Sequence, residues 1–252
     1  MSKNIIDLYR VFVKIKKLGY VKSMRDGVTG IGYTFETLIN KQEDNLPIAD
    51  YGDIEIKAMH RFSKRKIHLF NATPDGDFLL PIKRLVDDMG YPDKEFPKVK
   101  ILNVSVNTKD YTQIGFYKKM KIKVDYENEK IVLLGIKYEK NIDLAISWSF
   151  DMSKERLQNK LQYLAVVEAS SKVISGVEYF HYNKISFFKL RDYKLFIKLI
   201  EKGIITITFK VGVFRNGMKV GQIHDRGTDF SINYEDMRLL YKKYSIMRTF
   251  FM

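Results

Sequence analysis

Asp53-Ile54-Glu55-Ile56-Lys57-Ala58 is the stretch of the 252-residue sequence that decides the fold. Polar and apolar side chains alternate along it with the two-residue period of a β-strand. Ile54 and Ile56 therefore face one side of a sheet. Glu55 and Lys57 face the other side, about 6.5 Å apart along the strand. The pattern predicts a strand that presents a carboxylate and an ammonium group together.

Helices and strands are predicted on both sides of this stretch. Apolar residues with helical spacing predict helices at about residues 4–18, 34–42, 80–89, 154–162, 189–202 and 234–244. Alternation predicts strands at residues 66–70, 163–167 and 204–213, several antiparallel strands within 101–138, and a hairpin-like segment at 214–230. Because the two kinds of element are interspersed, we expect an α/β (α+β) fold with a mixed central sheet flanked by helices. The sequence shows no internal repeat, no low-complexity linker and no clear domain boundary.

Composition narrows the class of protein. The chain has no cysteine, which excludes disulfides, cysteine-ligated zinc, iron–sulfur clusters and thiol nucleophiles. It has no uncharged apolar stretch of about 18 residues and no signal-peptide pattern, so we expect a cytoplasmic protein that does not enter a membrane. Its net charge is +14, from 44 Lys and Arg against 30 Asp and Glu. Such an excess suits a polyanionic partner, although a surface that is simply rich in lysine would have the same composition.

A candidate metal site surrounds the deciding strand. Asp50 lies just before the strand, in a turn that contains Gly52, and can swing back towards Glu55. Two carboxylates beside an ammonium group are unfavourable unless a divalent cation joins them, and oxygen ligands alone suit Mg²⁺, with Mn²⁺ as an expected substitute. We expect Asp50 and Glu55 to hold the metal, together with the main-chain carbonyl of Ile56. Lys57 would then position or help to deprotonate the attacking water.

Two further acidic residues leave the composition of this site open. Glu36, on the predicted preceding helix, can complete the acidic cluster or support it from outside. Asp53 shares the face of Glu55 and Lys57 and competes with Asp50 as the first metal ligand, and we favour Asp50. The spacing Asp-x₄-Glu-x-Lys is weak by itself, since charged residues commonly alternate on the wet face of a strand.

Several separated motifs resemble those of one known family. They are Gly30-Ile31-Gly32, Thr34-Phe35-Glu36, Glu43-Asp44-Asn45-Leu46, the deciding strand, Trp148-Ser149-Phe150-Asp151, Lys160-Leu161-Gln162-Tyr163-Leu164-Ala165-Val166-Val167 and His224-Asp225-Arg226-Gly227-Thr228-Asp229-Phe230. Together and in this order, they span nearly the whole chain. The chain resembles the MvaI/BcnI-type restriction endonucleases, relatives of the MutH mismatch-repair nickase within the PD-(D/E)xK nuclease superfamily.

This resemblance implies one MvaI/BcnI-like unit over residues 1–252, with two lobes around a DNA-binding cleft. The catalytic lobe is expected at roughly residues 1–100 plus parts of 140–175, and the recognition lobe at roughly 101–140 and 176–252. Asp50, Glu55 and Lys57 are implied to carry catalysis, with Glu36 near them.

The activity that the resemblance implies is that of a type II restriction endonuclease. Such an enzyme hydrolyses phosphodiester bonds at a short, nearly palindromic duplex site, as a monomer that nicks one strand at a time, and its genetic partner is a DNA methyltransferase. The alternatives are a MutH-like strand-specific nickase in DNA repair and a non-catalytic basic DNA-binding module.

Charged residues near the C-terminus are candidates for reading the DNA sequence. Arginine can donate two hydrogen bonds to guanine, and aspartate can accept one from cytosine, although an exposed hairpin with paired charges is an alternative. Against the family pattern, Arg226 replaces a second histidine, Ser231 a basic residue and Lys210 an arginine, so a target other than CC(W or S)GG stays open. The predicted DNA-binding residues are Lys210, Arg215, Lys219, His224, Asp225, Arg226 and Ser231. The basic runs at residues 61–66 and 117–121 are candidates for phosphate contacts.

Overall fold

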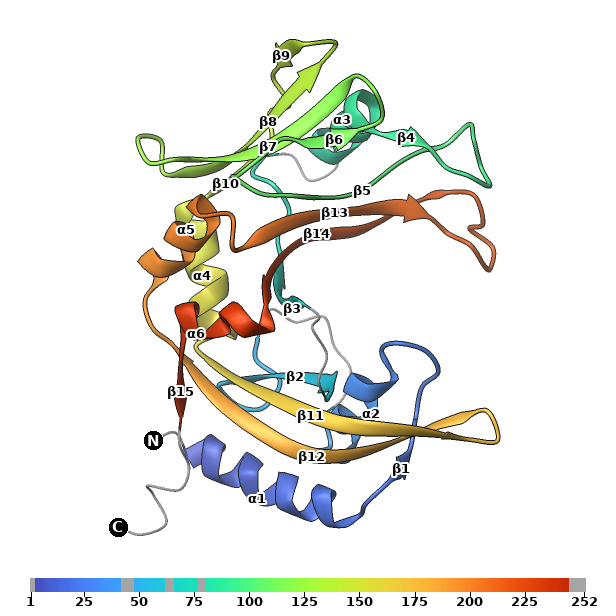
Figure 1. Cartoon of the computed structure of the whole chain (residues 1–252), viewed down its shortest axis with the longest axis vertical. Helices are drawn as coiled ribbons and strands as arrows, with labels where there is room; N and C mark the ends of the chain where they lie inside the picture. The colour runs from blue at the N-terminus through green and yellow to red at the C-terminus, as the bar shows by residue number, and fades with distance from the viewer. Residues whose placement is uncertain (1–2, 42–47, 62–65, 77–79, 245–252) are drawn as a thin grey trace. The chain divides into compact units, whose positions relative to one another are not determined.

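The chain is described by a computed structural model over residues 3–41, 48–61, 66–76 and 80–244. The predicted motif at residues 43–46 and residues 62–65 of the first basic run lie outside the described residues. Two compact units make up the chain (Figure 1). Unit 1 comprises Met1–Arg65, Glu155–Asp192 and Met237–Met252, and unit 2 comprises Lys66–Lys154 and Tyr193–Asp236.

Unit 1 is built on a five-stranded mixed sheet. Its strands follow the order β1 (Val21–Lys22), β12 (Val177–Leu190), β11 (Tyr163–Ile174) and β2 (Ile54–His60), and β15 (Tyr241–Tyr244) also pairs with β12. Only the β2–β11 pair among these is parallel, which confirms the mixed sheet predicted from the sequence.

Two helices cover the apolar face of this sheet. Figure 1 shows α1 (Lys3–Lys17) lying along β12, with α2 (Gly30–Leu38) beside β2. The apolar stripe of α1 is fully buried, as its helical periodicity predicts. Ile54 and Ile56 of β2 belong to the same core. The apolar face of β2 therefore faces the core, as the alternation of residues 53–58 predicts. The opposite face of β2 is left for Glu55 and Lys57.

Unit 2 contains two further five-stranded sheets. One has the order β10 (Ser147–Ser149), β8 (Lys130–Lys137), β7 (Lys118–Asp125) and β6 (Thr112–Ile114), with β9 (Lys140–Ile142) also paired with β8. The other has the order β3 (Lys66–Asn71), β14 (Ile223–Asn233), β13 (Thr206–Val213), β5 (Lys100–Val106) and β4 (Tyr91–Pro92). The unit also contains α3 (Leu80–Met89) and α5 (Tyr193–Glu201), while α4 (Phe150–Lys160) runs across the boundary of the two units in the sequence.

Stacked aromatic rings form the core of unit 2. Phe70, Phe196 and Phe230 lie with ring centroids 4.9–6.2 Å apart, and Trp148 meets Phe230 edge-on at 5.5 Å. The indole of Trp148 is fully buried, and its Nε1 donates a hydrogen bond to the carbonyl of Ala72 at 3.2 Å. Aromatic side chains bury large apolar areas, so this cluster holds strands from distant parts of the sequence together.

The chain ends differently from the prediction. The helix expected at residues 234–244 is wrong beyond Leu240: a 3₁₀ turn (Tyr234–Asp236) and α6 (Met237–Leu240) are followed by β15. Residues 241–244 pair antiparallel with Phe187–Leu190, and this tertiary pairing overrides the local helical pattern. The strand with which they pair, β12, was also not predicted.

The α2 helix begins earlier than predicted, at Gly30 instead of Thr34. A Cβ atom on Gly30 would lie 2.4 Å from the Arg25 carbonyl oxygen. The glycine therefore allows the helix to start against the preceding loop.

The two units also differ in sequence range from the two expected lobes. Residues 66–100 were expected in the catalytic lobe but belong to unit 2, because β3 pairs with β14. Residues 176–192 were expected in the recognition lobe but belong to unit 1, because β12 pairs with β11 along its whole length. The functional roles of the lobes stay predictions.

Candidate active site and nucleic-acid interface

A tight turn brings Asp50 back to the strand that follows it. Tyr51 and Ile54 exchange two main-chain hydrogen bonds of 2.9 and 3.0 Å, and Gly52 inside the turn has a φ of 62°, which favours glycine. Asp50 Oδ2 then accepts a hydrogen bond of 2.8 Å from the amide of Ile56. The turn therefore fixes the carboxylate of Asp50 against β2.

Glu55 is buried, which excludes the alternative that its charge simply alternates on a wet strand face. Only 1% of the residue is exposed. Its Oε1 accepts a hydrogen bond from Lys57 Nζ and lies 3.5 Å from Lys160 Nζ. Its Oε2 is buried and has no hydrogen-bond partner within the described part of the chain. A buried carboxylate oxygen without a partner is costly, so this atom marks a place for a ligand.

Burial dominates the electrostatics of Glu55. It raises the pKa of the carboxyl group, Asp50 raises it further, and Lys57 and Lys160 oppose the shift, which leaves a pKa of about 7. The ammonium groups of Lys57 and Lys160 therefore do not compensate fully for the loss of hydration of the Glu55 carboxylate. A divalent cation would favour the ionised form far more strongly.

The two candidate first ligands are held differently. Asp50 is half-buried, and its charge acts on Glu55. Asp53 is exposed, and its Oδ1 accepts a hydrogen bond of 2.8 Å from Asn4 Nδ2. This arrangement supports the choice of Asp50, whose role as a ligand stays a prediction.

Glu36 lies on α2 and is half-buried. It shares a hollow of about 290 Å³ with Ile56, Lys57 and the loop before α2. Among the described residues, no three of His, Cys, Asp and Glu gather at metal-binding distances, so Glu36 does not complete an acidic triad. The donors that fit a metal are therefore two carboxylates and the carbonyl of Ile56. Such a small set of oxygen donors suits Mg²⁺, which keeps several of its waters.

Lys160, which was not predicted as a site residue, lies beside Glu55. It ends α4, immediately before the strand that pairs with β2, and its ammonium group reaches Glu55. The only sequence signal was its position at the start of the motif that runs through Val167. Pairing of β2 with β11, which a single sequence does not reveal, brings it to the site.

The predicted DNA-reading residues lie on a hairpin in unit 2. Strands β13 and β14 pair antiparallel, and residues 214–222 connect them. A groove of about 360 Å³ on this sheet is lined in part by Lys210, Arg215 and Arg226, so the structure brings these three together. Asp225 and Lys219 are exposed, and the imidazole of His224 stacks on Phe214 with centroids 4.0 Å apart.

Two of the predicted DNA-binding residues, Arg215 and Ser231, contact other residues of unit 2. Both terminal nitrogens of Arg215 donate to the buried carboxylate of Asp93, at 2.9 and 2.6 Å. This pairing lowers the pKa of Asp93 to about 2. Ser231 is only 3% exposed, and its Oγ lies 3.3 Å from Oγ1 of Thr206, its partner on β13. These contacts favour structural roles for Arg215 and Ser231.

Asp229 is a buried acid that was not predicted to act at this surface. Lys210 Nζ lies 2.8 Å from its Oδ2, and His68 Nδ1 contacts its Oδ1. Burial alone would raise the pKa of Asp229, but His68 and Lys210 together hold it below its usual value. Asp229 therefore fixes the side chain of Lys210 within the groove.

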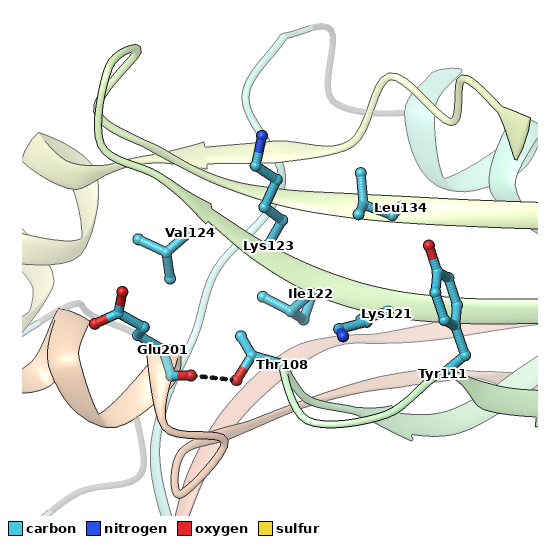
Figure 2. A pocket seen from close by; sticks show the side chains of 8 residues that line it. All are labelled: Thr108, Tyr111, Lys121, Ile122, Lys123, Val124, Leu134 and Glu201. Atoms are coloured by element: carbon cyan, nitrogen blue, oxygen red, sulfur yellow. Dashed lines mark hydrogen bonds between the residues drawn. The ribbon is translucent and has the colours of Figure 1, made fainter.

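A separate hollow of about 330 Å³ lies between β7, α5 and the loop after β5 (Figure 2). It is lined by Thr108, Tyr111, Lys121, Ile122, Lys123, Val124, Leu134 and Glu201. The hydroxyl of Thr108 donates to the carbonyl oxygens of Ile200 and Glu201, at 2.8 and 2.7 Å, and thereby caps the end of α5. Of the second basic run, Lys121 lines this hollow.

Comparison with known proteins identifies the family. The family model of the MvaI/BcnI restriction endonuclease family matches residues 10–241. The chain belongs to the MvaI/BcnI restriction endonuclease family. A search of curated protein sequences finds no match.

Two solved structures of the restriction endonuclease MvaI are similar to this chain. Each is 31% identical, over 97% of this chain and 98% of MvaI. The TM-score is 0.89 for the complex of MvaI with its cognate DNA substrate and 0.61 for MvaI in the absence of DNA. The restriction-endonuclease fold is thereby confirmed, and the chain is a site-specific DNA nuclease. No helix in the described residues is long and apolar enough to cross a membrane.

Proposed function

We propose that this restriction endonuclease cuts double-stranded DNA by Mg²⁺-dependent hydrolysis at the site formed by Asp50, Glu55 and Lys57. The observation that carries the proposal is the buried Glu55 carboxylate. One of its oxygens lacks a hydrogen-bond partner within the described residues, and Asp50 is fixed on the same strand segment. Burying a carboxylate without a partner destabilises the folded chain. A bound metal ion would explain why Glu55 is buried here.

Asp50, Glu55 and the carbonyl of Ile56 would hold the metal. When bound, Mg²⁺ or Mn²⁺ supplies a polarised phosphodiester oxygen and a bound water of lowered pKa. The chain itself supplies positive charge: Lys57 and Lys160 flank Glu55 and are placed to offset the charge that develops on the phosphate. Lys57 also orients the attacking water, and Glu36 supports the hollow that it shares with Lys57 and Ile56.

Unit 2 would read the base sequence. Lys210, Arg226, Asp225, His224 and Lys219 lie on the β13–β14 hairpin and its connection, and their mixed donors and acceptors suit base edges and phosphates. Arg215 contributes by holding the hairpin to Asp93.

The enzyme would act as a monomer that nicks one strand at a time. The sequence holds the Asp-x₄-Glu-x-Lys stretch once, so one chain provides one cutting centre. A DNA methyltransferase that protects the host site would be its genetic partner, and both would work in the cytoplasm. A MutH-like nickase is the second candidate, since it would use the same chemistry on one strand only.

The test is digestion of unmethylated phage DNA with Mg²⁺. We expect discrete fragments from the wild type, complete loss of cutting with EDTA, and a decrease of at least about 100-fold in rate for Lys57→Ala. Lys14→Ala, an exposed lysine on α1, is the matched control and should cut normally. Sequencing of the fragment ends gives the target and the cut position. A wild-type protein that cuts no DNA of varied sequence would refute the proposal.

A further inference from the structure

Three exposed aromatic rings lie together on the turns β6–β7 and β8–β9, in the sheet that contains strands β6 to β10. Phe116, Tyr117 and Tyr138 are 93%, 62% and 64% exposed. The centroid of Tyr117 lies 6.2 Å from that of Phe116 and 5.2 Å from that of Tyr138, on which it stacks. Single exposed apolar residues are ordinary, but a contiguous group on two neighbouring turns marks a contact surface.

The turn that carries Tyr138 has an unfavourable backbone. Lys137 pairs with Lys140, so Tyr138 and Glu139 are the two central residues of the turn between β8 and β9. Their φ values are 51° and 62°, in the left-handed region where such turns usually have asparagine and glycine. The Tyr138 amide donates to the Tyr117 carbonyl at 2.8 Å. A tyrosine in this conformation costs backbone strain, and its ring stacks on Tyr117 while remaining largely exposed, which points to use of the ring at a surface.

Lysines surround the rings. Lys118 and Lys137 are paired across β7 and β8, and Lys140 is exposed on β9. Lys137 Nζ lies 3.3 Å from Oδ1 of Asp88, which offsets part of this charge. Burial lowers the pKa of Lys118, and the charges of Lys100 and Lys137 lower it further, so these ammonium groups crowd one another. Crowded positive charge around exposed rings is complementary to a polyanion with apolar sugar and base surfaces, which is nucleic acid.

The segment that contacts the β13–β14 hairpin through Asp93 also contacts Lys118. Lys118 Nζ donates to the Gly90 carbonyl at 2.5 Å, and Asp93, three residues later, holds Arg215. Three residues span at most about 10 Å. DNA read by the hairpin would therefore continue close to the aromatic group.

We propose that Phe116, Tyr117, Tyr138, Lys118, Lys137 and Lys140 form a flank-binding patch for duplex DNA outside the recognised sequence. The lysines bind phosphates, and the rings pack on the adjoining sugars and base edges. The patch adds affinity without adding sequence preference. This inference rests on the proposed function, because it assumes that the hairpin reads a duplex.

The test measures binding in EDTA, so that it does not depend on cutting. Two duplexes carry the site found by end sequencing: one of about 10 base pairs, a single helical turn, and one of about 30. For Lys137→Gln/Lys140→Gln we expect a roughly tenfold loss of affinity for the long duplex at 0.1 M salt, and a salt slope smaller by about 2. Affinity for the short duplex should stay unchanged. Leu18→Ser, an exposed apolar residue on unit 1, is the control.

A second variant separates this role from a structural one. Tyr138→Asn/Glu139→Gly relieves the strained turn and removes the ring, so it should raise the melting temperature while it weakens binding to the long duplex. Unchanged affinity for the long duplex in both variants overturns the proposal, as does an equal loss on both duplexes. A change of oligomeric state with unchanged DNA affinity would assign the patch to contacts between copies of the chain. Failure of the wild type to bind either duplex would instead contradict the proposed function.

Discussion

Glu55 combines a buried carboxyl group with a pKa of about 7 in the metal-free chain. Below about pH 4.5 this group is protonated in both the folded and the unfolded chain and has no effect on stability. Between about pH 4.5 and 7 the unfolded chain ionises first, so folding loses stability as the pH rises. Each pH unit of displacement corresponds to about 1.4 kcal/mol, so the full cost is on the order of 3 kcal/mol.

Glu55→Gln should therefore stabilise the metal-free protein at alkaline pH. We expect an increase of about 1–3 kcal/mol in the free energy of unfolding at pH 8 and almost none at pH 4.5, because glutamine mimics the protonated acid. Urea denaturation at the two pH values measures it. Added Mg²⁺ should stabilise the wild type and leave the variant, which should not cut DNA, unaffected. Equal stability of the two proteins at pH 8 would contradict the buried charge.

Asp50 and Asp53 provide a matched pair of substitutions. Asp50→Asn can still accept the Ile56 amide but loses its charge, so we expect Mg²⁺ affinity to fall at least tenfold and cleavage at least about 100-fold. Asp53→Asn can still accept from Asn4 and should change both by less than about threefold. Calorimetric titration with Mg²⁺ and single-turnover cleavage measure the two effects. The opposite ranking would make Asp53 the first ligand.

At the scale of elements, the connection between β13 and β14 depends on the pairing of Arg215 with Asp93. This pairing lowers the pKa of Asp93 to about 2, so its stabilising effect is present above about pH 4 and is lost as the pH falls through about 2. Asp93→Asn should loosen residues 214–222 at neutral pH and make them roughly ten times more sensitive to proteolysis. Specific cleavage should slow in parallel. Glu95→Gln, whose carboxylate is more exposed and lies 3.4 Å from Arg215, is the control and should change little.

Local patterns predicted the elements that depend on local sequence. The α1 and α3 helices and the strands β2 and β3 lie where periodicity placed them, because their apolar residues repeat at the period of their own backbone. The β12 strand was missed although it forms a hairpin with β11 through the local turn at Ser175 and Gly176. The β15 strand was missed because it is stabilised by pairing with residues 187–190, which a single sequence does not show. The same limit hid Lys160, which approaches Glu55 only through the parallel β2–β11 pair, and the burial of Glu55 itself.

At the scale of the whole molecule, the residues proposed to cut DNA and those predicted to read it belong to separate units of the fold. Asp50, Glu55, Lys57 and Lys160 all belong to unit 1, and every predicted DNA-reading residue belongs to unit 2. The family resemblance implies such a division, but its boundaries could not be predicted, because each unit gathers segments from both halves of the chain. In the proposed mechanism, a chain with one cutting centre treats the two strands of a duplex in turn.

This order of events predicts the course of plasmid cleavage. With a supercoiled plasmid that holds one site, open circles should accumulate first and convert to linear DNA in a second, slower or equal step. The rate should rise in proportion to protein concentration, since one chain suffices for each cut. Gel analysis of a time course with enzyme in excess measures both steps, and a plasmid without the site is the control. Linear product without open circles, together with a rate that rises as the square of concentration, would indicate two chains acting together. Open circles that persist at saturation would identify a strand-specific nickase, because the centre that cuts the first strand would then have no means of engaging the second.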